Sequence, residues 1–484
     1  MRRRSGILMH ISSLYGDHSV GSFGRNALDF IDFLADNGFS AWQVLPFTVT
    51  DEYNSPYKSF SAFGGNPYFI DLETLFDDGL LTREELDGAR QATPYYCEFD
   101  RLAKERLPLL RKAYRRMKDF DKVGEFIAAH PRLEAFCRFM TLREQNGGKR
   151  WQEWTQNEVT DGETLGMWQF IQYEFFTQWA KVKEYANSKG VIIIGDIPIY
   201  VSDDSCDVWE NRKLFQIDER GYPSRVAGVP PDYFAEDGQL WGNPLYDWDE
   251  MKKDGFGWWR ERMDHTLEMF DGVRIDHFRA IESYWSVASD ETTAKNGKWV
   301  KGPGTSLFRA IEKELGKDLP IFAEDLGMIT PQVEKLRDTF HFPGMKVLQF
   351  AFNDTAESDF LPYLYPENCI CYTGTHDNDT TVGWYLELDE KYRDKVRRYM
   401  NCDGSNIHWD FIRTALGSTA RYAIFPLQDL FGFGSDCRMN TPGAAAGNWA
   451  WRYTSDRLSP ELAEALKTIS EVYGRDRARM EVHA

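Results

Sequence analysis

The sequence has no apolar run long enough to cross a membrane, and its start does not form a secretory signal peptide. The basic residues Arg2–Arg4 precede an apolar run, 6–9, that His10 and Ser12 soon interrupt. Cysteine is also scarce. The seven cysteines are odd in number and contain no C-x-x-C pair, which argues against a disulfide framework and indicates free thiols in a reducing compartment. We therefore expect a cytoplasmic protein.

Positive charge is in short supply. The chain carries 57 Lys and Arg against 76 Asp and Glu, which gives a formal net charge of -19 at pH 7. A surface this acidic repels the phosphate backbone of nucleic acids and the headgroups of anionic membranes. We therefore expect neither nucleic acid nor a membrane as partner. A neutral ligand such as a sugar is indifferent to this field.

Several cofactor and nucleophile motifs are absent. No G-x-G-x-x-G follows the first predicted strand, no G-K-[ST] phosphate loop occurs, and no G-x-S-x-G marks a serine nucleophile. The pairs Asp276–His277 and His376–Asp377 leave a divalent metal ion as an alternative, although no H-E-x-x-H or C-x-x-C pattern accompanies them. We predict that the protein uses no cofactor and no catalytic metal.

Aromatic residues, by contrast, are abundant. The chain has 16 Trp, 23 Tyr and 33 Phe, and so many Trp are hard to assign wholly to a core because Trp is rarely fully buried. Flat rings in a surface cleft suit the apolar faces of pyranose sugars, and their N–H or O–H groups remain free for sugar hydroxyls. The composition is therefore compatible with a carbohydrate ligand.

Apolar runs that are typical of buried strands alternate with helical patterns along the chain. The predicted strands are 6–11, 41–46, 191–196, 272–276, 321–325, 345–350, 369–375 and 422–427. This alternation predicts an α/β fold, a (β/α)8 TIM barrel with large, mostly helical insertions between strands. A doubly wound parallel sheet is the alternative, which the missing glycine fingerprint disfavours.

Two segments are too long to be simple loops. We assign 1–50 and 191–484 to the catalytic barrel and 51–190 to an inserted, mainly helical subdomain. A second insertion, 200–250, is rich in Gly, Pro, Asp and aromatic residues, and we expect it to line a cleft. The sequence leaves the oligomeric state open.

Polar residues follow several of the predicted strands. Asp196, Asp276, Glu324 and the pair His376–Asp377 stand at strand ends, and in a barrel the carboxyl ends of all strands meet at one rim. Such carboxyl groups often serve only as helix caps or partners of arginine. Together, however, they supply the two carboxyl groups that cleavage of a glycosidic bond needs, with a third to bind hydroxyls.

The surroundings of two carboxyl groups predict different roles. Arg274 and Asp276 lie two residues apart in a strand and therefore share a face, so the guanidinium favours the ionised form of Asp276 that a nucleophile needs. Glu324 follows the apolar segment 321–323, and partial burial raises the pKa of such a group, as an acid requires.

Long motifs in the chain resemble the amylomaltase or disproportionating-enzyme family of 4-α-glucanotransferases, within the wider α-amylase clan. The resemblance covers nearly the whole chain, from 6–8 to 447–452. Its motifs are Ser55-Pro56-Tyr57, Gly195-Asp196-Ile197-Pro198, Gly238-Gln239-Leu240-Trp241-Gly242-Asn243-Pro244, Val273-Arg274-Ile275-Asp276-His277-Phe278-Arg279, Ala323-Glu324-Asp325-Leu326-Gly327 and Thr373-Gly374-Thr375-His376-Asp377-Asn378.

The resemblance implies a role for each matching position. Asp276 matches the position of the family's nucleophile, and Glu324 matches that of its acid/base. Asp377 resembles the carboxylate that holds hydroxyls of the cleaved sugar. The implied substrate-binding residues are Arg274 and His376 in the innermost subsite, Trp241 near the acceptor, Tyr57 in the cleft, and Asp196, Gln239 and Asn448.

The resemblance also implies the reaction. It predicts transfer of α-1,4-glucan segments from a donor malto-oligosaccharide to the 4-OH of an acceptor glucan or glucose, by a retaining double displacement through a covalent glycosyl-enzyme. Two alternatives stay open. The first is a retaining hydrolase of the α-amylase type that uses the same three carboxyl groups. The second is a glucan-binding protein on a decayed barrel, which predicts the loss of a carboxylate, whereas all three are present.

Overall fold

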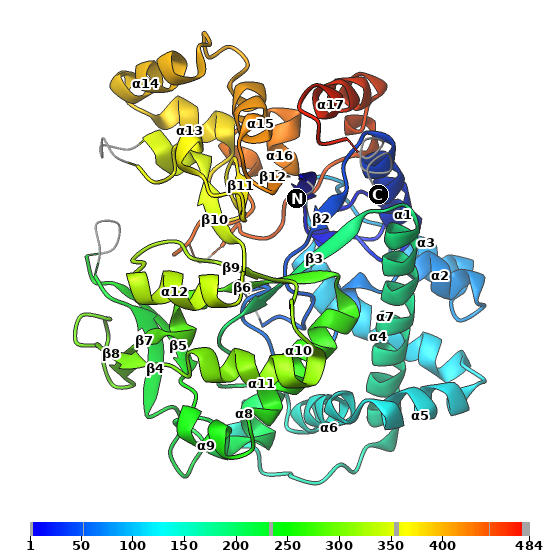
Figure 1. Cartoon of the computed structure of the whole chain (residues 1–484). Helices are drawn as coiled ribbons and strands as arrows, with labels where there is room; N and C mark the ends of the chain where they lie inside the picture. The colour runs from blue at the N-terminus through cyan, green and yellow to red at the C-terminus, as the bar shows by residue number, and fades with distance from the viewer. Residues whose placement is uncertain (1–2, 52, 232–235, 353–357, 445, 477–484) are drawn as a thin grey trace.

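The computed structural model describes residues 3–51, 53–231, 236–352, 358–444 and 446–476. Within these ranges, eight parallel strands form one sheet in the order β10-β11-β12-β1-β2-β3-β6-β9, which curls into a nearly closed barrel (Figure 1). The strands are β1 (Arg4–Leu8), β2 (Ala41–Gln43), β3 (Ile192–Pro198), β6 (Gly272–Asp276), β9 (Ile321–Ala323), β10 (Gly344–Val347), β11 (Cys369–Tyr372) and β12 (Tyr422–Pro426). Each overlaps a predicted strand, so the predicted (β/α)8 barrel is confirmed.

The barrel closes at the seam between β9 and β10, the two ends of the strand order. The backbone N–H of Ala323 donates to the carbonyl of Pro343 at 2.9 Å. Above it, the N–H of Met345 donates to Oδ1 of Asp325 at 2.7 Å, so a side chain takes the place of a backbone acceptor. Gly344 leaves room for this carboxylate, because a Cβ there would lie 2.5 Å from Oδ2 of Asp325.

The interior of the barrel is filled by apolar side chains that alternate along the strands. Its buried cluster includes Leu8, Ile194, Phe322 and Ile424. A polar contact lies among them, where the hydroxyl of Tyr372 donates to Oε1 of Gln43 at 2.7 Å. A second, larger core fills the space between the strands and the surrounding helices. The strand ends are therefore anchored on both faces of the sheet.

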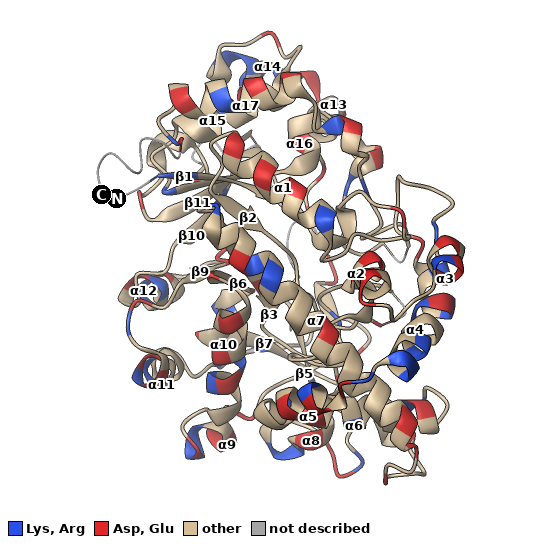
Figure 2. Ribbon diagram, turned by 90° about the vertical axis from the view of Figure 1, so that its right-hand side faces the viewer, with Lys and Arg blue, Asp and Glu red and all other residues tan. Residues whose placement is uncertain are grey.

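Helices connect the strands and form the outer layer (Figure 1). They are α1 (Arg25–Asp36), α8 (Cys206–Glu210), α9 (Trp248–Lys253), α10 (Gly257–Met269), α11 (Thr305–Leu315), α12 (Pro331–Thr339), α13 (Thr381–Glu387), α14 (Glu390–Met400), α15 (Ile407–Gly417), α16 (Leu427–Phe431) and α17 (Pro460–Val472). Figure 2 shows charges of both signs spread over these outer helices, whereas the strands inside are mostly uncharged. Among the residues that the structure describes, no helix combines the length and the apolar character of a membrane span.

The segment 51–190 is mainly helical, whereas its assignment as an inserted subdomain stays a prediction. Its helices are α2 (Leu72–Asp77), α3 (Arg83–Gly88), α4 (Phe99–Arg116), α5 (Phe120–Ala129), α6 (Pro131–Gln145) and α7 (Gly162–Ser188). The last helix also belongs to the wall of the barrel, since the ring of Trp179 packs 4.7 Å from that of Phe47 and 5.7 Å from that of Phe270. The boundary of the inserted subdomain at residue 190 stays a prediction.

A second sheet, which the sequence pattern did not predict, lies beside the barrel. In the described part of the chain its antiparallel order is β5-β4-β7-β8, with β4 (Arg225–Val229), β5 (Gln239–Pro244), β7 (Ser283–Ala288) and β8 (Lys298–Lys301). It joins the insertion 200–250 to the segment that follows β6. Its two edge strands are short and largely exposed, so they carry no apolar run that would have revealed them.

Candidate active site

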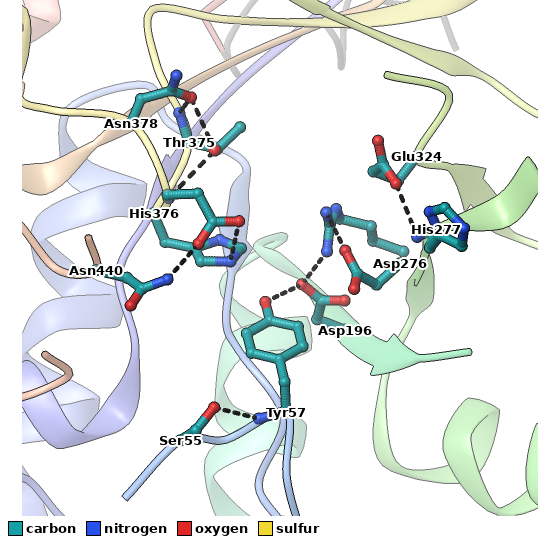
Figure 3. A network of polar contacts seen from close by, with 12 residues as sticks. Ser55, Tyr57, Asp196, Asp276, His277, Glu324, Thr375, His376, Asn378 and Asn440 are labelled. Atoms are coloured by element: carbon teal, nitrogen blue, oxygen red, sulfur yellow. Dashed lines mark hydrogen bonds and ion pairs between the residues drawn. The ribbon is translucent and has the colours of Figure 1, made fainter. Parts of the chain in front are cut away.

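The predicted carboxyl groups lie at the carboxyl ends of the barrel strands. Asp276 is the last residue of β6, Glu324 directly follows β9, and Asp377 follows β11 in the next loop. Asp196 lies within β3, two residues before its end. In Figure 3, Asp276 and Glu324 face Tyr57 and the segment around His376 across the mouth of the barrel. The expectation of a common rim is thus confirmed.

Arg274 holds two of these carboxylates at once. It is 4% exposed, and its register partner on β3 is Asp196. One guanidinium nitrogen donates to Oδ2 of Asp196 and the other to Oδ1 of Asp276, both at 2.6 Å. The predicted contact between Arg274 and Asp276 on one strand face is therefore confirmed. The side chain of Asp276 remains 30% exposed and reachable from the mouth of the barrel.

Asp196 lies beneath Arg274 as a buried counter-charge. Burial raises the pKa of Asp196 to about 7, and the guanidinium of Arg274 works against this rise. The hydroxyl of Tyr57 donates to the same oxygen, Oδ2, at 2.8 Å (Figure 3). Tyr57 in turn stacks on His376, with ring centroids 5.2 Å apart and an angle of 13°. Asp196 thus supports Arg274 and Tyr57 from below.

Glu324 has the environment of a proton donor. It is 8% exposed, and burial, followed by the negative charge of Asp276, raises the pKa of Glu324 to about 8. The backbone N–H of His277 donates to Oε2 at 2.7 Å and that of Leu326 to Oε1 at 2.8 Å. The sequence prediction of a raised pKa is confirmed, and the two N–H groups fix the orientation of the carboxyl group.

His277 orients Glu324 through its backbone, a role that the sequence pattern did not predict. It has a positive φ of 52°, a conformation that is uncommon for residues other than glycine, and this sharp turn directs its N–H toward Glu324. Burial lowers the pKa of His277 to about 4, so the ring is neutral. The ring meets that of Trp241 edge-on at 4.8 Å. The only signal for this role in the sequence was the position of His277 directly after Asp276 in the motif at the end of β6.

Asp377 directly follows His376, which lies across from Asp276 and Glu324 in Figure 3, and its side chain is 45% exposed. Nε2 of His376 is 3.3 Å from Oδ2 of Asp377. Nδ2 of Asn440 donates to Oδ1 at 2.6 Å. Burial lowers the pKa of His376, which keeps its ring neutral. Asn440 lies in the segment between α16 and α17, and no motif in the sequence pointed to it.

The remaining predicted binding residues divide into two groups. Trp241 lies next to His277 and donates through its indole N–H to Oε1 of Gln239 at 3.1 Å, so Gln239 orients the ring. Asn448 makes its side-chain hydrogen bonds within its own loop. Its side chain accepts from the N–H of Thr441 at 2.9 Å and donates to the carbonyl of Ala444 at 3.0 Å. It therefore stabilises its own loop.

Within the described residues, no three His, Cys, Asp or Glu side chains form a group that could hold a metal ion. The chemistry available at the rim is that of carboxyl groups. An acid with a pKa near 8 stands beside an accessible carboxylate that is paired with arginine. This combination suits general acid catalysis together with nucleophilic attack at a glycosidic carbon.

Known proteins that are similar to this chain are named 4-alpha-glucanotransferase or amylomaltase. Residues 9–458 match a family model described as 4-alpha-glucanotransferase. A 4-alpha-glucanotransferase from Synechocystis sp. is 46% identical, with 98% of each chain covered. One from Thermus thermophilus is 43% identical, with 98% of this chain and 99% of that protein covered. The structure of an amylomaltase from Streptococcus agalactiae in complex with acarbose superposes with a TM-score of 0.95 at 38% identity, over 98% of this chain and 100% of that chain. The chain belongs to the 4-α-glucanotransferase family.

Proposed function

We propose that the protein transfers α-1,4-glucan segments from a donor malto-oligosaccharide to the 4-OH of an acceptor glucan or glucose, with Asp276 as nucleophile and Glu324 as acid/base. The observation that carries this proposal is the contrast between the two groups. Glu324 is buried with a pKa of about 8, whereas Asp276 is accessible and ion-paired with Arg274 at 2.6 Å. At neutral pH such a pair holds a proton on one side and an attacking carboxylate on the other.

The first half-reaction follows from this arrangement. Glu324 donates its proton to the glycosidic oxygen while an oxygen of Asp276 attacks the anomeric carbon, so the C–O bond breaks and a glycosyl ester forms. The leaving glucan departs with the proton. Arg274 contacts Oδ1 of Asp276 and orients the carboxylate during attack.

The second half-reaction is the reverse of the first with a new alcohol. Glu324, now ionised, removes the proton from the acceptor 4-OH, and the oxygen displaces Asp276 from the anomeric carbon. Two inversions give retention, so the product is α-1,4-linked. The ester also explains how a transferase keeps the glycosyl group while the donor remnant leaves and the acceptor enters.

The other site residues act on binding. We assign Asp377 and His376 to the hydroxyls of the sugar that is cleaved, because their side chains lie opposite Asp276 and Glu324 at the rim. We assign Trp241, whose ring contacts that of His277 at the end of β6, to packing against a sugar ring. The related amylomaltase was solved in complex with acarbose, which supports an oligosaccharide as ligand here. The free cysteines also favour the predicted cytoplasmic location.

The test is an assay on maltotriose with products separated by length. Transfer predicts glucose together with chains longer than the substrate, whereas a hydrolase of the α-amylase type predicts shorter products only. Asp276→Asn and Glu324→Gln should each abolish transfer, while Glu464→Gln on the exposed surface of α17 serves as the control and should retain it. Near-normal transfer by Asp276→Asn would refute the assignment of the nucleophile.

The anomeric form of fresh product tests the double displacement directly. Retention predicts that proton NMR detects the newly formed linkage in the α configuration. When water takes the place of the acceptor, the newly formed reducing end should likewise be in the α form before mutarotation. A β product would mean that water or acceptor attacks in a single step and that no ester with Asp276 forms. Azide offers a second test with a glucosyl donor whose leaving group needs no proton. Because Glu324→Gln can form the glycosyl-enzyme from such a donor but lacks the base that activates an acceptor, azide should intercept the intermediate in this variant but not in Glu464→Gln.

A further inference from the structure

We infer that Asn440 is a positioning residue for transfer, which holds the carboxylate of Asp377 in the orientation that binds sugar hydroxyls. The inference rests on the proposed function, which places Asp377 against the sugar in the innermost subsite. Asn440 is 8% exposed, and its Nδ2 donates to Oδ1 of Asp377 at 2.6 Å (Figure 3). This is a short hydrogen bond to a charged acceptor, the stronger class of hydrogen bond in proteins.

The backbone of Asn440 is fixed to the same loop that its side chain contacts. Its N–H donates to the carbonyl of His376 at 3.1 Å. Arg438 completes the link, because one guanidinium nitrogen donates to the carbonyl of Asp377 at 2.5 Å and Nε donates to the carbonyl of Asn440 at 2.7 Å. The loop after β11 and the segment after α16 are thus joined at several points, so the side-chain amide of Asn440 reaches Asp377 in a defined position.

The two oxygens of Asp377 have different neighbours. Oδ1 accepts from Asn440, and Oδ2 lies 3.3 Å from Nε2 of His376. A carboxylate rotates about its Cβ–Cγ bond unless a partner holds it, and the hydrogen bond from Asn440 restrains this rotation. Each oxygen keeps further acceptor capacity for hydroxyls, because an ionised carboxylate has about four lone-pair sites.

The neutral amide explains why asparagine suits this position. It donates a hydrogen bond without adding charge, so the carboxylate remains an acceptor for the substrate. An aspartate of the same shape would place a second negative charge at 2.6 Å, and one of the two carboxyl groups would then have a raised pKa. In acid the pair shares a proton, and a hydrogen bond between residues 440 and 377 is restored. This difference separates a role as donor from a role in packing alone.

The experiment compares the pH profiles of kcat and KM on maltotriose for three variants in the full-length enzyme. Asn440→Ala should lower kcat about 10- to 100-fold at every pH with a smaller change in KM, because the lost contact is one to a charged group that matters most in the transition state. Asn440→Asp should show a similar loss at pH 8 and regain activity relative to wild type as the pH falls toward 5. Thr441→Ala, whose backbone contacts with Asn448 are retained, is the matched control and should resemble wild type.

Each other outcome overturns the inference. Wild-type kinetics for both Asn440 variants would show that Asp377 needs no positioning by this amide. Equal, pH-independent losses in Asn440→Asp and Asn440→Ala would show that the residue matters for packing and not as a donor. A fall in thermal midpoint with kcat per active site unchanged would likewise show a role in packing alone. Asp377→Asn is measured in parallel. Its failure to reduce transfer would refute the proposed role of Asp377 itself, which is a separate result.

Discussion

The stability of Glu324→Gln relative to wild type should increase as the pH rises, although the variant no longer catalyses transfer. The physical reason is proton linkage. The unfolded chain loses the proton of Glu324 near the usual pKa of 4.5, whereas the folded protein keeps it until about pH 8. Between these values the folded state binds more protons, so its stability decreases as the pH rises. Glutamine cannot ionise and escapes this cost.

The magnitude follows from the pKa. Between pH 5 and pH 8 the carboxyl group costs the wild-type protein about 4 kcal/mol, at about 1.4 kcal/mol for each pH unit. The backbone N–H groups of His277 and Leu326 donate to the two oxygens of Glu324. In glutamine an NH2 group replaces one of these oxygens, so two donors face each other, which costs about 1–3 kcal/mol at every pH. Because this penalty is the same at every pH, it cancels when the difference in free energy of unfolding between variant and wild type at pH 8 is compared with that at pH 5.

Thermal unfolding measures this comparison. With an unfolding entropy of about 2.1 cal/mol/K for each of the 484 residues, 1 kcal/mol shifts Tm by about 1 °C. The Tm of Glu324→Gln minus that of wild type should therefore rise by about 4 °C from pH 5 to pH 8. Glu464→Gln, which removes an exposed carboxyl group, should show no such trend. A difference that stays constant or falls with pH would refute the burial argument for Glu324.

Three further outcomes are expected. The kcat/KM for maltotriose should fall as the pH rises through about 8, because Glu324 then loses the proton that it donates; an undiminished rate at pH 9.5 would contradict this. Arg274→Lys keeps the positive charge but loses the two separate guanidinium donors. The lysine should therefore contact only one of the two carboxylates and lower kcat about 10- to 100-fold. Wild-type kinetics would argue against the need for both contacts. Gly344→Ala should lower the free energy of unfolding by about 1–3 kcal/mol, because the new Cβ would overlap Oδ2 of Asp325 at 2.5 Å; an unchanged thermal midpoint would show that the β9–β10 seam tolerates the methyl group.

Much of the barrel was predictable because strands buried on both faces appear as continuous apolar runs. The pairing of Arg274 with Asp276 was predictable for an equally local reason, since residues two apart in a strand share a face. The raised pKa of Glu324 followed from the apolar residues that precede it. All three inferences use neighbours in the sequence, and the structure bears them out.

The second sheet and the hydrogen bond from Asn440 to Asp377 could not be predicted in this way. The strands β4 and β7 pair although more than 50 residues separate them, and the exposed edge strands beside them have no distinctive pattern. Asn440 lies 63 residues beyond Asp377, and one asparagine in a polar loop is like any other until the loop is placed. The side chain of Asn448, which the resemblance implied as a binding residue, makes hydrogen bonds within its own loop, and its role in binding stays a prediction.

The sequence by itself indicated the eight barrel strands and the carboxyl groups near their ends, and its family motifs implied a glucan as substrate, because hydrophobic periodicity and motif identity are properties of the linear chain. Only the tertiary structure decided which groups touch. Asp196 beneath Arg274, the N–H of His277 on Glu324, and the amide of Asn440 on Asp377 all join separate strands or loops. Their contacts depend on the closure of the barrel, which brings the carboxyl ends of distant strands to one rim and buries them there.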